Sequence, residues 1–418
     1  MGNVTKSQQN NITSPNGNSL AVFVEGTTGI MKVKDVMGNI QPLSDFIILG
    51  ASSPFQYDAN GTGIEPVLGT NNASGVFATI GGGQGNIASC ILSTVGGGSN
   101  NRASNVYSTV SGGSINRACG DRSTIGGGSS NLISNCSPSS TISGGNSNSI
   151  SNACSTIGGG KNNIASCIFS TVGGGTNNIA SELNSTVGGG CGNTASGSNS
   201  VIAGGGGYYI GNTTFVANSV IVGGGYNKIL LGTGTYGSQK TGDFIGGGFC
   251  NLIATYHPYS SYTGCKNSSI IIAGFCNSII GRTNASVISG GNFNSINGNS
   301  SSPIYNSVIS GGYSNLICHS GQNSVIGGGF QNTASGTSST IGGGSCNTAS
   351  GNYSAILGGG NNNTNTCEKA IIVGSDITAD RVCTTFVNNL SIKNIPTASA
   401  GLPSGSVWRN GTVLEIVS

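Results

Sequence analysis

Residues 93–104 read Ser-Thr-Val-Gly-Gly-Gly-Ser-Asn-Asn-Arg-Ala-Ser, and this pattern recurs along most of the chain. If its aliphatic residue is taken as position zero, seventeen copies follow one another, most often fifteen residues apart. A fixed short period of this kind is the sequence signature of a solenoid. Position zero falls at Ile80, Val95, Val110, Ile125, Ile142, Ile157, Val172, Val187, Ile202, Ile221, Ile245, Ile271, Ile288, Ile309, Ile326, Ile341 and Ile356.

Four columns of the repeat are almost invariant. Position zero is always Ile or Val, and position +6 is Asn in every copy except the one with Tyr208. Position +8 is Ala or Ile except at Thr364, and position −2 is Ser except at Ala78 and Asp243. We take as structural repeat residues Ile80, Val95, Val110 and Ile125 at position zero, and Asn86, Asn101, Asn116 and Asn131 at position +6.

A fifteen-residue unit is too short for a pair of helices, and it predicts an all-β coil of two short strands and two corners. Position zero and its neighbours are β-branched, as a pleated surface favours. Glycine permits positive φ and close approach at the corners. Asn at position +6 also tolerates the left-handed region, and its amide can bond to the Asn one coil away. We therefore predict a parallel β-solenoid of about seventeen coils, with positions zero and +8 inside.

Position −1 points to the opposite face from position zero, yet it is Thr or apolar in every copy. Examples are Thr94, Val201, Phe244, Ile270 and Val287. An apolar row on the outside of a solenoid with a thin core predicts a second buried surface. We expect the chain to associate with copies of itself along this row.

Seven steps of the repeat are longer than fifteen residues, and the extra residues are expected after position +8 at one corner of the coil. Segment 254–268 is rich in aromatic residues, and segment 230–243 carries Tyr236, Lys240 and Asp243. Aromatic side chains at loops give rigid contact area for receptors and stack on sugars. The alternative is that these side chains pack on neighbouring coils or chains. The candidate receptor-binding residues are Tyr236, Tyr256, His257, Tyr259 and Tyr262.

The runs Ser-Val-Ile-Ala-Gly at 200–204 and Ser-Ala-Ile-Leu-Gly at 354–358 resemble the head repeats of trimeric autotransporter adhesins of the YadA type. The resemblance covers roughly residues 72–375. It implies a left-handed parallel β-roll, three chains around one axis, and a role in binding surfaces. The trimer it implies is intertwined or built side by side.

The ends of the chain are similar to a different class of protein. Those adhesins carry a signal peptide, a coiled-coil stalk and a membrane anchor, and we expect none of them here. Residues 29–46 and 395–417 instead resemble bacteriophage tail-fibre and related virion proteins. This predicts an N-terminal attachment and β segment with a linker (1–71), the repeat domain (72–375) and a C-terminal β module (376–418). Within the first segment, 19–25 and 30–34 read as strands.

The composition limits the range of partners. The 418 residues include 75 glycines and only 6% charged side chains, with a net charge of +3. This charge is too small to indicate nucleic acid or an anionic membrane, and no stretch is long enough to insert in a membrane. The 13 cysteines change position from copy to copy, so we expect reduced thiols and assembly in a host cytoplasm.

The sequence carries no recognisable catalytic or metal-binding pattern. His257 and His319 are the only histidines, and they are far apart. Four acidic residues in the repeat region are not in register, which disfavours a pair of glycosidase carboxylates. No pairs of Cys and His have zinc-site spacing, and the glycine runs lack a phosphate-loop Lys-Ser/Thr. We expect no cofactor, no metal and no enzymatic activity.

The first functional hypothesis is a structural fibre of a virus, a phage tail or head fibre, that presents a host-surface binding region. Its partners would be other virion proteins at the N-terminal segment and a host-surface glycan or protein. The second is a cellular surface adhesin or self-assembling extracellular filament. A polysaccharide depolymerase is disfavoured by the missing acid pair. An ice-binding protein, suggested by Thr at nine of the seventeen −1 positions, ranks last.

Overall fold

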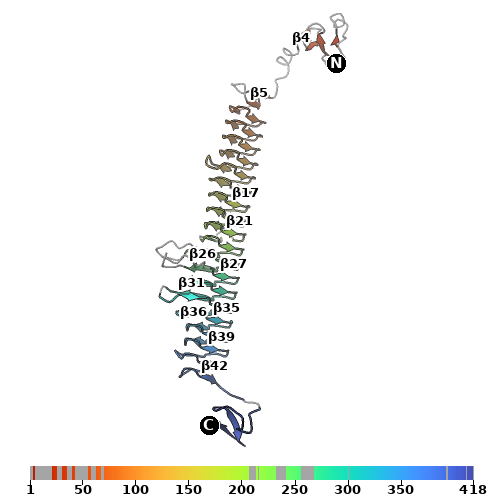
Figure 1. Ribbon diagram of the computed structural model, residues 1–418. Coiled ribbons are helices and arrows are strands. Elements are labelled where there is room, and N and C mark those ends of the chain that lie inside the picture. The colour runs from red at the N-terminus through yellow and green to blue at the C-terminus, as the bar shows by residue number, and fades with distance from the viewer. Residues whose placement is uncertain are drawn as a thin grey trace. The chain divides into compact units, whose positions relative to one another are not determined.

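The computed structural model shows an all-β protein. It is a β-solenoid of about 19 turns of parallel, stacked strands (Figure 1). The all-β solenoid expected from the repeat is therefore confirmed. The chain divides into two compact units, Met1–Gly189 and Gly190–Ser418. The structure describes residues 3–4, 21–25, 31–34, 40–42, 55–57, 63–66, 70–206, 213–214, 216–231, 242–255, 268–299, 301–391, 394–410 and 412–417.

Each coil contributes one strand at position zero and one at position +8. Strand β9 (Thr94–Val95) pairs in parallel with β11 (Thr109–Val110), so that Val95 lies opposite Val110. Strand β10 (Arg102–Ala103) pairs in the same way with β12 (Arg117–Ala118). The two sheets of the solenoid therefore grow by one strand per coil, and equivalent residues of successive coils are neighbours.

The first unit begins with a small sheet and continues into the solenoid. Strands β1 (Asn3–Val4), β2 (Ala21–Glu25), β3 (Met31–Lys34) and β4 (Ile40–Pro42) form a four-stranded sheet in chain order, which confirms the two strands expected there. The position-zero ladder contains β6 (Ile64–Pro66), β7 (Thr79–Ile80), β9, β11, β13 (Thr124–Ile125), β15 (Thr141–Ile142), β17 (Thr156–Ile157), β19 (Thr171–Val172) and β21 (Thr186–Val187). The position +8 ladder contains β8 (Ile87–Ala88), β10, β12, β14 (Leu132–Ile133), β16 (Ser149–Ile150), β18 (Ile164–Ala165) and β20 (Ile179–Ala180).

The second unit repeats this plan and ends in a hairpin. Its position-zero ladder contains β23 (Val201–Ile202), β25 (Val220–Ile221), β27 (Phe244–Ile245), β29 (Ile270–Ile271), β32 (Val287–Ile288), β35 (Val308–Ile309), β37 (Val325–Ile326), β39 (Thr340–Ile341), β41 (Ala355–Ile356), β42 (Ile371–Val373) and β43 (Thr385–Val387). Its position +8 ladder contains β22 (Thr194–Ala195), β24 (Thr213–Thr214), β26 (Lys228–Leu231), β28 (Leu252–Thr255), β30 (Ser278–Gly281), β33 (Ser295–Gly298), β36 (Leu316–Cys318), β38 (Thr333–Ala334) and β40 (Thr348–Ala349). Outside these ladders, β31 (Thr283–Asn284) pairs with β34 (Ile304–Tyr305), and β44 (Val407–Asn410) pairs with β45 (Val413–Ile416).

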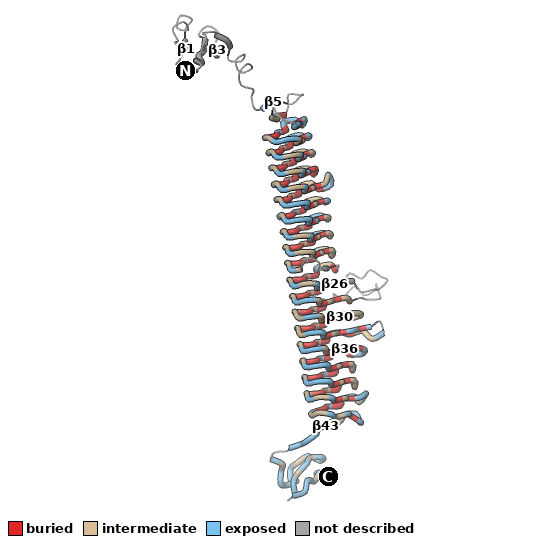
Figure 2. The backbone as a smooth tube through the Cα atoms, turned by 180° about the vertical axis from the view of Figure 1, so that it is seen from behind, coloured by how far each residue is buried: buried red, intermediate tan, exposed pale blue. Residues whose placement is uncertain are grey.

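The core consists of the two columns that the repeat predicts. The position-zero residues Ile80, Val95, Val110 and Ile125 are fully buried, as is Ala103 at position +8. In Figure 2, every coil of the solenoid contains buried residues (red) next to half-buried (tan) and exposed (pale blue) ones. Because each coil buries only one or two apolar side chains from each sheet, polar groups must supply part of the cohesion.

Much of that cohesion comes from the asparagines at position +6, which are buried in every described coil. The backbone N–H of Asn101 donates to Oδ1 of Asn86 at 3.0 Å, and its Nδ2 donates to the carbonyls of Gly97 and Gly113, both at 2.8 Å. The side-chain amide of Asn101 thus bonds within its own corner and to the coil after it, while its backbone N–H bonds to the side chain of Asn86 in the coil before it. The expected bond between successive asparagines is confirmed.

The conformational reason given for these asparagines was wrong. Most of the left-handed residues other than glycine lie at positions +5 and −3, such as Asn100 (φ 54°) and Tyr107 (φ 56°), whereas Asn101 is not among them. Position +6 needs Asn because its buried amide can donate and accept at once. Position +5 faces outward and accepts many side chains.

The longer steps mostly insert residues where expected, after position +8, but one does not. In the coil of Ile202, Thr213 and Thr214 pair with Thr194 and Ala195, so the position +8 residue is Thr214. Its extra residues therefore precede this strand rather than follow it. Assigning Tyr208 to position +6 of this coil was wrong, because counting straight from Ile202 ignored the insertion.

A polar cap covers the N-terminal end of the solenoid. Pairing of Ile64 with Thr79 puts Glu65 in register with Ile80, at the interior position. Its Oε2 accepts the N–H of Ala73 at 2.9 Å, and its Oε1 accepts from Nε2 of Gln56 at 3.2 Å. Gln56 belongs to β5 (Phe55–Tyr57), which pairs antiparallel with β6. A carboxylate in the core column, together with a strand of opposite direction, opposes the addition of further coils.

Candidate binding surface

The five residues predicted for receptor binding, Tyr236, Tyr256, His257, Tyr259 and Tyr262, lie outside the described residues. Their role therefore stays a prediction. The described part of the second unit contains a different group of aromatic side chains. We call this group the aromatic row: Tyr226, Phe249, Phe275, Phe293, Tyr313 and Phe330.

The aromatic row is continuous over six successive coils. Ring centroids are 6.5 Å apart between Tyr226 and Phe249, 5.8 Å between Phe249 and Phe275, and 5.5 Å at each of the three later steps. The rings are stacked at three steps and edge-on at the two steps on either side of Phe293. Both arrangements suit aromatic quadrupoles and stabilise neighbouring coils.

The backbone of the glycine-rich corner positions these rings. Each coil supplies one ring, from position +4 in Phe249, Phe275, Tyr313 and Phe330 and from position +5 in Tyr226 and Phe293. Parallel bridges place Phe249 beside Phe275 and Tyr313 beside Phe330. Where the ring moves to position +5, the N–H of Phe293 donates to the carbonyl of Phe275 at 2.9 Å, which keeps the two coils in contact.

The rings remain substantially exposed despite their mutual contact. Their exposed fraction runs from 38% for Phe249 to 46% for Phe293. If the rings served only to hold the corner together, burying them more fully would give more hydrophobic stabilisation. Six exposed rings in one line therefore form a preorganised apolar strip that a ligand could cover.

The surroundings of the strip are polar but almost uncharged. Among the described residues from 216 to 346, the only Lys, Arg, Asp and Glu are Lys228, Asp243 and Arg282. The Lys228 ammonium lies 4.2 Å from the ring centroid of Tyr226, and Asp243 is buried. Ser314 and Gln331 occupy position +5 beside the rings of Tyr313 and Phe330. The strip thus offers ring faces together with neutral hydrogen-bonding groups.

Reading the sequence by its fixed columns missed this row. Positions +4 and +5 vary widely between polar residues, Gly, Cys and aromatic residues, with Ile115 as an aliphatic exception, so neither forms a column by itself. The available signal was an aromatic residue at one or the other position in six consecutive copies, from Ile221 to Ile326. The two positions are neighbours at one corner, and they must be read together.

A second exposed row differs between the units. At position −1 the first unit has Thr in all eight copies from Thr79 to Thr186, whereas the second has Val201, Val220, Phe244 and Ile270 in its first four. These side chains are half-buried or exposed in the chain by itself. The apolar part of the predicted association surface therefore lies in the second unit.

One cysteine and one histidine come together, but the environment does not favour a nucleophile. Nδ1 of His319 lies 2.8 Å from Sγ of Cys318. Cys318 is buried, and this burial raises the pKa of its thiol. A reactive cysteine needs the opposite shift, because the thiolate is the nucleophile. The pair is better described as a buried thiol covered by an exposed imidazole.

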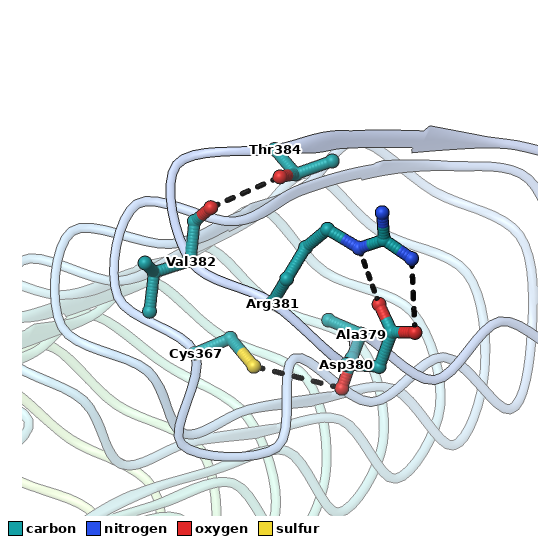
Figure 3. Close-up of polar contacts among 6 residues, drawn as sticks. All are labelled: Cys367, Ala379, Asp380, Arg381, Val382 and Thr384. Carbon is teal, nitrogen blue, oxygen red and sulfur yellow. Dashed lines mark hydrogen bonds and ion pairs between the residues drawn. The ribbon is translucent and has the colours of Figure 1, made fainter.

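Polar contacts at the last coils are structural in character (Figure 3). The guanidinium of Arg381 donates to Asp380 through Nε at 2.9 Å and Nη2 at 3.2 Å, and the bond lowers the pKa of this carboxyl. Both side chains are well exposed, so the ion pair contributes little. Sγ of Cys367 donates to the carbonyl of Ala379 at 3.6 Å, which joins two successive turns.

The described residues contain no group of three or more Cys, His, Asp or Glu arranged to hold a metal ion. No helix among them could cross a membrane. Comparison with protein-family models and with curated proteins gives no match to this chain.

Proposed function

We propose that the protein is a structural fibre protein of a virus that presents a binding region for the host surface. The observation that carries the proposal is the aromatic row, a half-exposed strip on a regular ladder of coils. The ladder repeats one set of backbone contacts and supplies a rigid support. The viral assignment rests on the resemblance of residues 29–46 and 395–417 to phage tail-fibre proteins.

The ligand class that fits the strip best is a neutral, extended glycan. Sugar rings present apolar C–H faces that stack on aromatic rings and hydroxyls that bond to side chains such as Gln331. Rings 5.5–6.5 Å apart provide several weak contacts along one ligand, and several copies of the chain would add avidity. The scarcity of charge around the strip disfavours a strongly acidic or basic partner.

A fibre of this kind would act as a homotrimer attached to the virion. We place the contact between copies on the apolar −1 row of the second unit, and attachment to other virion proteins on the N-terminal segment. The proposal includes no catalytic step. Release of oligosaccharides from host polysaccharide by the purified protein would contradict this part.

Binding is tested with the double substitution Phe249→Ser and Phe275→Ser. The matched control is Phe169→Ser, because Phe169 is 54% exposed and has Cys154 and Asn184, not rings, at the same position of the adjacent coils. On an array of neutral and acidic oligosaccharides, we expect the parent and the control to bind neutral linear glycans. The double variant should bind at least about tenfold more weakly, because each lost stacking contact costs about 1 kcal/mol.

Location is tested separately, with gold-labelled antibodies against the repeat domain and electron microscopy. Labelled fibres on purified particles support the virion assignment. Label restricted to the surface of cells would replace it with the adhesin or filament alternative. If the double variant keeps the affinity of the parent while circular dichroism shows both folded, the aromatic row is structural and the binding region lies elsewhere.

A further inference from the structure

Two cysteines occupy equivalent positions in adjacent coils, beside the aromatic row. Cys250 and Cys276 both lie at position +5, directly after Phe249 and Phe275. Both have left-handed backbones, with φ of 59° and 54°, so their side chains leave the corner in the same direction. Both are free thiols of intermediate exposure. Neither takes part in the proposed ligand contact.

Backbone contacts hold this pair in register. Phe249 and Phe275 form a parallel bridge, and the N–H of Cys276 donates to the carbonyl of Phe249 at 2.9 Å. On the other side, the N–H of Leu252 donates to the carbonyl of Asn277 at 2.9 Å. Registered residues in adjacent strands are about 4.8 Å apart, which is within the roughly 4.4–6.8 Å range of Cα separations in disulfides.

We propose that Cys250 and Cys276 form a reversible disulfide across two coils, which makes this corner an oxidation-sensitive modification site. The bond would close residues 250–276 into a loop that contains the longest insertion of the repeat. It would also fix the two coils that carry Phe249 and Phe275. This role does not depend on what the aromatic row binds.

The electrostatics of the pair agree with this geometry. The pKa of Cys276 is raised, first by burial, then by the charge of the neighbouring Cys250 and by a hydrogen bond with its side chain. Either thiolate can make the first attack, and both orders give the same bond.

With glutathione disulfide as the oxidant, the step balances as two exchanges. In one order, the Cys250 thiolate attacks one sulfur of glutathione disulfide, forms a mixed disulfide and releases one glutathione thiolate. Cys276 loses its proton and attacks Sγ of Cys250, which forms the cross-coil bond and releases the second glutathione thiolate. Two protons leave the protein, and two electrons reduce glutathione disulfide to two glutathione molecules.

The bridge should be easy to reduce. Parallel side chains in register keep their Cβ atoms about one strand spacing apart, ~4.8 Å, whereas relaxed disulfides have roughly 3.5–4.5 Å. Closing the bond therefore strains the corner, and strained, accessible disulfides are the labile ones. The disulfide is therefore expected to be reversible rather than permanent.

Cys346 is a matched internal control. It lies at the same position +5 and has the same left-handed backbone (φ 54°), but the adjacent coils carry Gln331 and Asn361 there. Its Sγ donates to Oε1 of Gln331 at 3.8 Å rather than to a thiol. Under the same oxidant we expect a mixed disulfide with glutathione at this residue.

The test treats the intact folded protein with glutathione disulfide, digests it under acidic conditions and identifies the cysteine products by mass spectrometry. We expect a cross-linked pair of peptides joining Cys250 to Cys276, and glutathione retained on Cys346. Unfolding in urea before oxidation should lower the yield of this pair at least about tenfold. In Cys250→Ser, Cys276 should retain glutathione.

Other products would overturn the proposal. Two glutathione molecules that remain on Cys250 and Cys276 would show that the corner cannot close. A bond from either one to Cys265, or between two chains, would show that a different thiol is nearer in solution. An equal yield from folded and unfolded protein would show that the fold does not bring the pair together.

Discussion

At the scale of the residue, the buried asparagines hold successive coils together, as apolar side chains do in proteins with a larger hydrophobic core. Asn116 donates to the carbonyls of Gly112 at 3.0 Å and Gly128 at 2.9 Å, and its Oδ1 accepts both the N–H and the Nδ2 of Asn131. No other side chain of this size has donors and an acceptor in this arrangement. Its loss would remove the acceptor of the Asn131 N–H and the donor to the Gly112 carbonyl, whereas the Gly128 carbonyl would keep the N–H of Ser114.

We therefore expect Asn116→Ala to destabilise its coil by about 2–3 kcal/mol, the cost of buried polar groups left unsatisfied. The readout is local hydrogen exchange, in which the amide of Asn131 should exchange at least about tenfold faster, since ~1.4 kcal/mol is a factor of ten. Arg117→Ala, an exposed change at the next residue, should leave that rate unaltered. If the backbone amide of Asn131 exchanges at the same rate in Asn116→Ala and in the parent, water has taken over the hydrogen bonds of the missing side chain.

The raised pKa of Cys276 gives a pH-dependent prediction. In the folded chain this thiol keeps its proton to higher pH than in the unfolded chain. The rate of its alkylation by iodoacetamide should therefore begin to rise at a higher pH in the folded protein than in the unfolded protein. Its contribution to stability is present below the unfolded thiol pKa and is lost as pH rises through the folded one. In Cys250→Ser, the pH at which Cys276 becomes reactive should fall only part of the way towards its value in the unfolded chain. Burial, the largest cause of the raised pKa, remains in this variant. A profile identical to that in urea would refute the assignment.

At the scale of the element, the glycine runs divide into positions that need glycine and positions that only contain it. A Cβ on Gly113 would lie 2.1 Å from the carbonyl oxygen of Gly128 and 2.7 Å from Nδ2 of Asn116, at a φ of +87°. A Cβ on Gly112 would meet nothing within 4 Å. The glycine at position +3, here Gly113, is therefore the one that lets two coils approach.

These two neighbours make a direct comparison. We expect Gly113→Ala to destabilise the coil by about 3 kcal/mol or more, since a forced clash adds to an unfavourable φ. Gly112→Ala should stay within about 0.5 kcal/mol of the parent, as is usual for surface substitutions. Urea unfolding of the two variants measures the difference. If both unfold at the same urea concentration, the corner is more compliant than its contacts indicate.

The strands, the interior columns and the Asn ladder could be predicted from the sequence because each recurs at the same position. Ile80 and Asn86 need only the period to be assigned. Thr214 could not be placed, because an insertion within its coil shifts the count and only strand pairing restores it. The aromatic row was missed because Phe275 and Phe293 occupy different positions and meet only through the corner geometry.

At the scale of the whole molecule, the proposed contact between copies is the apolar −1 row of the second unit. Val287 in β32 is half-exposed at position −1 of the second unit, and Thr171 in β19 is its counterpart in the first. If the apolar row forms the trimer contact, Val287→Asp should bury an unpaired charge and weaken assembly by about 3 kcal/mol or more. Thr171→Asp should have much less effect.

Analytical ultracentrifugation of the intact protein across a range of concentrations measures this difference. A parent protein that remains monomeric throughout would exclude the trimer. Equal weakening by both substitutions would extend the contact to the threonine row of the first unit.

The in-register pairing of equivalent residues has a consequence for inheritance. Gly96 and Ser111 both follow a position-zero residue, Val95 and Val110, so joining Val95 directly to Ser111 would delete one coil and still present matching edges. Unequal recombination between repeats could thus shorten or lengthen the gene by whole coils without creating a misfolded junction. The number of coils then becomes a trait that selection can adjust, while the sequence of each coil stays almost the same.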